Sequence, residues 1–299
     1  MIDCTLVTCR IVPALDPDDR LLYDELCKRG LDVAIAAWDD PETEWGATRL
    51  CVLRSTWDYH ERYPDFVAWL RRAELVTAIR NDPRLLRWNA HKSYLRALQS
   101  SGVPIVPTAW IRAGSRCDLA SLTQRRGWRD AVVKPALGAA AHDVTLVRRD
   151  GASSQAQGQA ALDRLVATED ALVQPYLDSV TGYGERALIF IGGVYSHAVV
   201  KEPFDTVLSI SDAPSSRIDA TPEEIAVAAK AVAGVPGPPI YARVDLLRDQ
   251  RNVPCVNEFE LIEPALYLAV HAPARKAFAD AIERELAAIA VKSRASLSL

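Results

Sequence analysis

The sequence lacks the features that mark membrane, secreted and nucleic-acid-binding proteins. No apolar run approaches the ~20 residues that a transmembrane helix needs. The first ten residues, MIDCTLVTCR, have no basic start and no long apolar stretch, so we do not expect a signal peptide. With 35 Lys and Arg against 39 Asp and Glu, the net charge is −4, and no basic block stands out. Nucleic acid is therefore not an expected partner, and we expect a cytoplasmic protein.

Cysteine patterns typical of zinc sites and disulfide frameworks are also missing. None of the six cysteines forms a CxxC pair, and several stand in apolar runs. Buried free thiols are the expected state of these side chains. The cysteines are Cys4, Cys9, Cys27, Cys51, Cys117 and Cys255.

The order of strand and helix patterns divides the chain. At 299 residues it is too long for one small core, and two or three subdomains of roughly 100 residues are expected. Strand and helix patterns alternate over the first 80 residues, which favours a parallel sheet with helices on both faces. Beyond residue 82 the alternation stops, and two strand patterns meet at Gly192-Gly193, which is typical of a hairpin. The predicted subdomains are 1–84, 85–177 and 178–299.

The middle of the chain contains one long helical pattern and one polar stretch. Residues 82–102 are predicted to form a single helix that ends at Gly102. DGASSQAQGQ, residues 150–159, is predicted to be a loop before the next helix.

Several acids stand in the strand-like stretch CVNEFELIEPALYL, residues 255–268. Glu258 and Glu260 are two apart, so their side chains share one face of a strand. Asp245 lies on the preceding strand pattern, two residues after Arg243, and the four groups converge if the strands pair. Such an oxygen-rich cluster suits Mg²⁺, although an ion-paired strand with one solvent face is the alternative. The residues expected on the opposite face are Asn257, Phe259 and Leu261.

A lysine and a small-residue loop form a second candidate site. In VVKPALGAAAHDV, Lys134 ends a strand pattern and Gly138 and residues 139–141 follow. Small residues let backbone N–H groups approach phosphate oxygens, and the lysine adds a positive charge. No G-K-[ST] follows, so this is not a Walker A motif, and an ordinary turn is the alternative. LVQPYL, residues 172–177, ends a strand and could read an adenine edge or be a plain loop.

Taken in order, these motifs resemble the ATP-grasp superfamily of carboxylate-amine ligases. They are WNAHKSYLRAL, VVKPALGAAAHDV, VQPYLDSVTGYGE, YSHAVVKEP, ARVDLL and VNEFELIEP, and they span about residues 85–270. The resemblance implies an N-terminal parallel α/β domain followed by a two-subdomain ATP-grasp fold. It also implies an ATP- and Mg²⁺-dependent ligase of EC class 6.3 that forms a carbon–nitrogen bond through an acyl phosphate.

The resemblance also implies roles for individual residues. Lysines and the small loop would hold the phosphates, the hinge would read adenine, mainly through backbone at its last two positions, and an acid would bind the ribose. These ATP-binding residues are Lys92, Lys134, Gly138, Ala139, Ala140, Gln174, Tyr176, Leu177, Glu185 and Lys201. The implied Mg²⁺ ligands are Asp245, Glu258 and Glu260. Arg243 and Lys201 are the implied catalytic residues at the transferred phosphoryl group.

Two positions depart from the family pattern. The third metal position is usually Asn and is Glu260 here. The phosphate loop is rich in alanine, which adopts positive φ less readily than glycine. His142 beside this loop could reach a phosphate or face solvent.

Candidate substrate residues follow the third strand pattern, in LRSTWDYHERY. This segment would lie at the carboxyl end of the parallel sheet, where open α/β sheets bind ligands. There Arg54 could clamp a carboxylate and Asp58 could hold an ammonium, with Tyr59 beside them. A surface turn with Trp57 and Tyr59 packed beneath it is the alternative. Glu263 lies beyond the acid-bearing strand and could face the acceptor pocket or start a helix.

The wording of SHAVVKEP and VNEFELIEPALYL resembles small stand-alone ligases of secondary metabolism. It is similar to the O-ureido-D-serine cyclo-ligases of the biosynthesis of cycloserine, an antibiotic. These enzymes close a ring within one small amino-acid-like substrate. An intermolecular ligase similar to glutathione synthetase or to the glutamate ligases of ribosomal protein S6 is the alternative. A nucleotide-binding module without activity is a further one. The small-residue loop and residues 202–216 are candidate lids, and such ligases are often homodimers.

Overall fold

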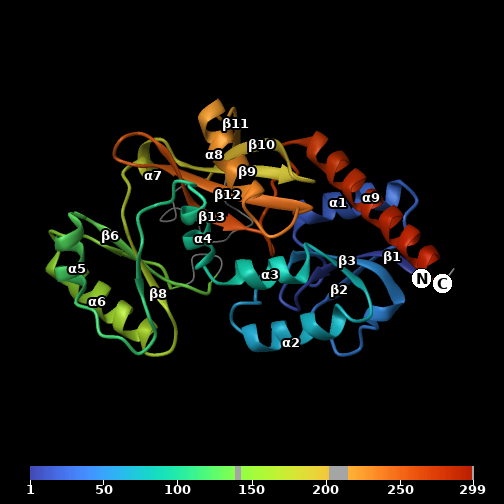
Figure 1. Ribbon diagram of the computed structural model, residues 1–299, viewed down its shortest axis with the longest axis horizontal. Helices are drawn as coiled ribbons and strands as arrows, with labels where there is room; N and C mark the ends of the chain where they lie inside the picture. The colour runs from blue at the N-terminus through green and yellow to red at the C-terminus, as the bar shows by residue number, and fades with distance from the viewer. Residues whose placement is uncertain (139–142, 202–214, 298–299) are drawn as a thin grey trace.

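Three β-sheets form the framework of the described chain (Figure 1). The computed structural model describes residues 1–138, 143–201 and 215–297. In the view of Figure 1 the N-terminal sheet (blue) and the central sheet (green) lie at opposite ends, with the third sheet (yellow to orange) above and between them. A parallel sheet is thus followed by two antiparallel ones, and the predicted α/β class is confirmed.

The N-terminal sheet is parallel and is built from alternating strands and helices. In spatial order its strands are β2 (Val33–Ala37), β1 (Ile2–Thr8), β3 (Thr48–Ser55) and β4 (Ala78–Arg80). The helices of this region are α1 (Pro17–Lys28), the short 3-10 helix η1 (Trp45–Ala47) and α2 (Tyr63–Ala73). Helix α1 begins after Asp16, whose side chain accepts a hydrogen bond from Asp18 N at 2.8 Å and so caps the first turn.

The last helix, α9 (Ala272–Leu297), returns to the N-terminal sheet. Figure 1 shows it (red) running beside α1. Its buried Phe278 and Ile282 belong to the same apolar cluster as Leu6 and Leu50 of the sheet. The chain therefore completes its first layer with its last element, and the predicted boundaries at residues 84 and 177 stay a prediction. None of the described helices, α9 included, is long and apolar enough to cross a membrane.

The central sheet is small and antiparallel. Its strands, in spatial order, are β5 (Ala109–Ile111), β8 (Ala171–Pro175), β6 (Ala131–Pro135) and β7 (Thr145–Val147). Helices α5 (Leu119–Arg126) and α6 (Ala152–Val166) pack on it. The predicted loop over 150–159 is wrong, since α6 already begins at Ala152. Alanine and glutamine favour helix, and Gly158 and Leu162, four residues apart, are buried on one face.

The third sheet is antiparallel and carries most of the candidate site. Its strands, in spatial order, are β11 (Ser215–Ile218), β10 (Val194–Lys201), β9 (Glu185–Ile191), β12 (Tyr241–Arg248) and β13 (Pro254–Glu260). Helix α7 (Ser179–Gly182) precedes it, and α8 (Pro222–Ala233) packs against it. The hairpin predicted at Gly192-Gly193 is confirmed, and both glycines have positive φ.

The predicted single helix over 82–102 is wrong, because the chain forms α3 (Pro83–Ala90) and α4 (Tyr94–Ser100) with a break between them. At the break, the Lys92 backbone N–H donates to Ala136 O at 2.7 Å, and His91 makes a β-bridge to Leu137. An N–H that bonds to another segment cannot close a helical turn. This break places Lys92 next to the end of β6.

We expect Gly158→Ala to lower the free energy of unfolding. A Cβ at Gly158 would overlap a Val147 methyl group and lie 3.1 Å from Leu119 Cδ2. Overpacking of this kind costs about 1–3 kcal/mol, more than the ~1 kcal/mol that alanine gains over glycine in a helix. Urea denaturation measures the change, with the exposed Gln157→Ala as control. A stabilised Gly158→Ala protein would contradict the close packing of Val147 and Leu119 against this helix.

Candidate active site

Strands β12 and β13 bring the predicted acids together. Antiparallel pairing sets Asp245 opposite Glu258 and Arg243 opposite Glu260. One carboxylate oxygen from each of Asp245, Glu258 and Glu260 lies within 4.8 Å of the other two. The predicted convergence of these four residues on a strand pair is thus present, whereas their roles stay predictions.

A β-bulge brings a further residue, Asn257, to the site. The register of the hairpin shifts between Asp245 and Leu246, which leaves Asn257 as an extra residue on β13. Its amide donates to Glu185 Oε1 at 2.6 Å, and its Oδ1 lies 3.4 Å from Lys134 Nζ. The expectation that Asn257 faces away from the acids is wrong, because strand periodicity does not reveal a bulge.

Two cations neutralise Asp245, which is fully buried. Arg243 Nε lies 2.9 Å from Asp245 Oδ1, and the same guanidinium also pairs with Glu260. Lys201 Nζ lies 2.9 Å from Asp245 Oδ2 and 2.9 Å from Glu185 Oε2. Burial lowers the pKa of Arg243, but the carboxylates of Asp245 and Glu260 hold that pKa well above its usual value. Burial also lowers the pKa of Lys201, but Asp245 and Glu185 raise it above its usual value, so both cations remain charged at neutral pH.

Glu258 is surrounded by lysines. Lys134 Nζ lies 3.1 Å and Lys92 Nζ 3.9 Å from Glu258 Oε1. Lys92 Nζ also donates to Gly138 O at 2.6 Å, so it spans from the acid to the first residue of the small loop. Burial raises the pKa of Glu258, yet Lys92, Lys134 and Lys201 outweigh it and hold the pKa far below its usual value. Glu258 is therefore ionised.

Glu260 behaves differently from Glu258. Burial, assisted by Asp245 and Glu258, raises the pKa of Glu260 to about 7, although Arg243 opposes the rise. A divalent cation beside it would favour its ionised form. The charge of the acid at the position where the family usually has Asn therefore depends on its surroundings.

The three carboxylates form an oxygen-only donor set that fits Mg²⁺. Hard cations prefer such ligands, and two of the three acids sit on directly paired strand positions. The counter-ions that the acids have now, Lys134, Lys201 and Arg243, are groups that can turn to phosphate oxygens instead.

The edge of β13 is held by side chains of the α3–α4 segment. Asn89 Nδ2 donates to Phe259 O, and Leu261 N donates to Asn89 Oδ1, both at 2.8 Å. The Tyr94 hydroxyl accepts from Phe259 N at 3.0 Å. These bonds flank Glu260 and fix the strand that carries it. Sequence reasoning missed Asn89 and Tyr94. The sole signal was an asparagine, Asn89 itself, within the apolar helical pattern RLLRWNA.

The predicted adenine hinge lies at the end of β8. Gln174 is buried and donates to Thr108 Oγ1 at 2.9 Å, and Tyr176 N donates to Asp130 O at 2.9 Å. Among the described residues the Tyr176 carbonyl and the Leu177 N–H have no backbone partner, which leaves one acceptor and one donor for a ligand edge. An apolar cluster lies at this hinge, formed by Val106, Leu177, Leu247 and Cys255.

Some predicted residues lie outside the described part of the chain. They are Ala139 and Ala140 of the phosphate loop, His142, and residues 202–214 of the second candidate lid.

The structure does not bring Arg54 to the site. Arg54 is fully buried, its Nε lies 2.8 Å from Asp19 Oδ1, and its Nη2 donates to Pro264 O at 2.7 Å. Its guanidinium also stacks over the Tyr241 ring, 4.8 Å from the centroid. A substrate carboxylate cannot reach this side chain, so these contacts correct the expectation of a clamp. The arginine instead links the N-terminal sheet to the loop after β13.

Asp58 is also engaged within the protein. It is buried, accepts a hydrogen bond from Trp38 Nε1 at 2.8 Å, and pairs with Arg62. Because both oxygens already have partners, these contacts argue against the expected ammonium-binding role.

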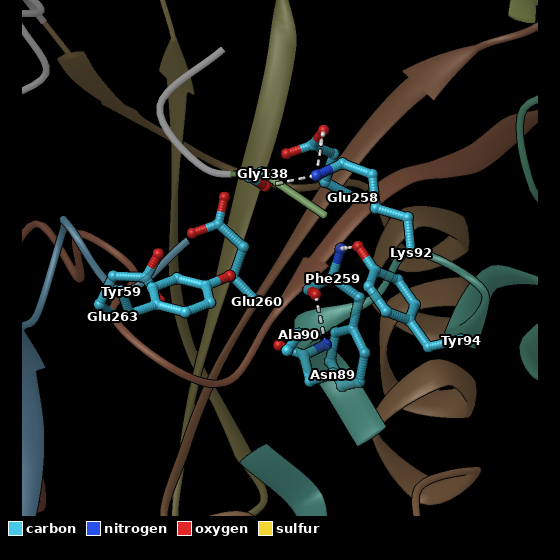
Figure 2. Close-up of a pocket in the computed structure, with 10 residues that line it drawn as sticks. All are labelled: Tyr59, Asn89, Ala90, Lys92, Tyr94, Gly138, Glu258, Phe259, Glu260 and Glu263. Atoms are coloured by element: carbon cyan, nitrogen blue, oxygen red, sulfur yellow. Dashed lines mark hydrogen bonds and ion pairs between the residues drawn. The ribbon is translucent and has the colours of Figure 1, made fainter. Parts of the chain in front are cut away.

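Tyr59 and Glu263 do reach the acids. A pocket beside the acid cluster is lined by Tyr59, Asn89, Ala90, Lys92, Tyr94, Gly138, Glu258, Phe259, Glu260 and Glu263. Figure 2 shows Tyr59, Glu260 and Glu263 on one side of it and Lys92 with Glu258 on the other. The pocket thus joins the predicted phosphate, metal and substrate residues.

Comparisons with known proteins agree with this arrangement. Residues 4–81 match the family described as "D-cycloserine synthetase DcsG, N-terminal domain". The cycloserine biosynthesis protein DcsG of Streptomyces lavendulae is 34% identical over 295 residues, which cover 94% of this chain and 98% of the relative.

Solved structures of similar proteins share the fold of this chain. The crystal structure of D-cycloserine synthetase DcsG superposes with a TM-score of 0.84 at 31% identity, covering 95% of this chain and 99% of that one. The ATP-grasp ligase PsnB, solved with a precursor variant, Mg and ADP, has a TM-score of 0.62 at 17% identity, covering 95% and 98%. The predicted ATP-grasp fold is confirmed.

We expect Arg54→Met to destabilise the protein by about 3–5 kcal/mol, because it leaves Asp19 as a buried charge with no cation. The double variant Arg54→Met, Asp19→Asn should recover part of this loss. Urea denaturation measures both, and Arg71→Met on the exposed face of α2 serves as control. Unchanged stability together with a higher KM for a carboxylate substrate would contradict this prediction and support Arg54 as the residue that binds the substrate carboxylate.

Proposed function

Because the chain belongs to the D-cycloserine synthetase (DcsG) family of ATP-grasp ligases, we propose that it uses ATP to close a ring within O-ureido-D-serine, on the path to D-cycloserine. One observation carries the proposal: three carboxylates, an arginine and three lysines form one cluster beside the pocket. This set suits the stabilisation of phosphoryl transfer, in which negative charge spreads over phosphoryl oxygens.

The reaction has two bond-forming steps. The substrate carboxylate attacks the γ-phosphorus of ATP, ADP leaves, and an acyl phosphate forms. The oxygen-linked nitrogen of the ureido group then attacks the acyl carbon, loses its proton, and expels phosphate. Water then attacks the carbamoyl carbon, the bond from that carbon to the ring nitrogen breaks, the nitrogen gains a proton, and carbamic acid leaves, since D-cycloserine lacks this group. No step needs a nucleophilic side chain.

Different residues of this chain would contact different parts of ATP. Lys92 and Lys134 lie beside the small loop and would hold phosphate oxygens, while Arg243 and Lys201 would meet the charge on the transferred group. Mg²⁺, held by the acid cluster, would supply charge neutralisation at the phosphates. The hinge at Tyr176 and Leu177 would bind adenine through its carbonyl and N–H.

Glu185 does not stand free for the ribose. Its carboxylate is bound by Lys201 and Asn257, at 2.9 and 2.6 Å. We therefore propose that Glu185 acts on the ribose only after Lys201 has turned to a phosphate.

An assay of phosphate release tests the function directly. We expect phosphate from the protein with ATP, Mg²⁺ and O-ureido-D-serine as the single further substrate. A requirement for a second amine or amino acid would favour an intermolecular ligase. ATP binding without phosphate release from any amino-acid substrate would favour a binding module and would refute the proposal.

Glu258→Gln should lower the rate of phosphate release by at least about 100-fold, because it removes a charged group from the centre of phosphoryl transfer. The amide is isosteric, so the far-UV circular dichroism should change little, whereas the loss of the Glu258–Lys134 ion pair should lower the unfolding midpoint. Glu223→Gln, on an exposed carboxylate, is the control and should keep full activity. Retained activity in Glu258→Gln would contradict the metal assignment.

A further inference from the structure

Glu263 differs from every other acid at the pocket. It is 8% exposed and lines the pocket next to Tyr59 and Glu260 (Figure 2). Glu258 is paired with Lys134, and Glu260 with Arg243. Within the described residues, no lysine, arginine or histidine nitrogen lies within ion-pair distance of Glu263. The pocket therefore holds one buried acidic group more than its side chains neutralise.

An acid left in this state marks a place for a positive ligand group. Burial, together with Glu260, raises the pKa of Glu263 well above its usual value, although Arg243 and Lys92 oppose the rise. A buried carboxyl group without a cation beside it costs free energy that an incoming cation can recover. The group faces the pocket, so that cation must come from the ligand.

The position of Glu263 matches the geometry of an α-amino acid, an argument that rests on the proposed function. The substrate carboxylate must lie beside Arg243 and the acid cluster in order to accept the phosphoryl group. Its α-ammonium is bonded to the neighbouring carbon, so the group that binds it must adjoin the same site. Glu263 does so, since it shares the pocket with Glu260, the partner of Arg243.

Tyr59 adds a second polar group at this side. It is 4% exposed, and its ring is fixed against Phe66 at a centroid distance of 5.3 Å. Glu263 and Glu260 are the two acids with the largest effect on its hydroxyl, whose pKa is raised by burial first and by these acids next. A phenol oxygen can accept a hydrogen bond from an ammonium.

We propose that Glu263, with the Tyr59 hydroxyl, binds the α-ammonium group of the amino-acid substrate. The pair then selects an amino acid over the same acid without its amino group. It also aims the substrate, because the ammonium and the carboxylate are held at two fixed points.

The variant Glu263→Gln tests this subsite with two compounds, O-ureido-D-serine and its desamino analogue 3-(ureidooxy)propanoic acid. In phosphate release with ATP and Mg²⁺, the variant should raise the KM for O-ureido-D-serine about 10- to 100-fold, the factor that a hydrogen bond between charged groups corresponds to. The kcat and the KM for ATP should stay within about twofold. Tyr59→Phe should give a smaller rise in the same KM.

The desamino analogue shows whether the ammonium is the group that is bound. Its KM should be high in the wild-type protein and unchanged by Glu263→Gln. The matched control is Glu285→Gln, because Glu285 lies on α9 and its carboxylate pairs with Arg80. This variant should leave the KM for both compounds unchanged. A loss in kcat at constant KM, or an equal loss for both compounds, would overturn the subsite.

Calorimetry separates this inference from the proposed function. Both compounds are titrated into wild-type and Glu263→Gln protein that holds Mg²⁺ and a non-hydrolysable ATP analogue. If O-ureido-D-serine binds more tightly than the desamino analogue to the wild-type protein, and this difference is lost in the variant, the subsite is supported even when no phosphate is released. The absence of phosphate release would refute only the proposed function. Equal affinities of the two proteins, or no binding to either, overturn the subsite.

Discussion

The ion pairs between the acids of β12–β13 and the surrounding lysines and arginine are the interaction on which the site depends. Asp245 alone would be costly, because it is fully buried and taking an unpaired charge out of water costs several kcal/mol. The pair of Glu258 with Lys134, at 3.1 Å, joins the third sheet to the central sheet. The same contact therefore neutralises the site and holds two parts of the fold together.

This charge balance also explains why the site can change partners. The lysines that neutralise the acids are the ones that the ATP-grasp resemblance assigns to phosphates. An anionic nucleotide could take over the lysines and the arginine, and a divalent cation could take over the acids. Glu263 stands outside this exchange, because it has no lysine or arginine partner among the described residues. It is therefore the acid that a substrate cation can reach.

The support of β13 shows how the N-terminal half positions the acids. β13 is an edge strand, and unpaired edges invite other partners. Here Asn89 and Tyr94 bind the backbone around Glu260, and Val106 N donates to Val256 O at 2.9 Å further along. The break between α3 and α4 brings these side chains and Lys92 to the same edge. A helix of 82–102 without that break would carry Lys92 away from the loop at Gly138.

Local pattern determined which residue types meet at the site, because periodicity and motif order are properties of the chain itself. Spacing placed Glu258 and Glu260 on one face, and alternation predicted the parallel sheet. Tertiary contacts decided the rest. From the sequence we expected Arg54 to bind substrate, yet it forms an ion pair with Asp19, 35 residues away. The bulge at Asn257 and the break at Lys92 arise from pairing with distant segments, which no local pattern records.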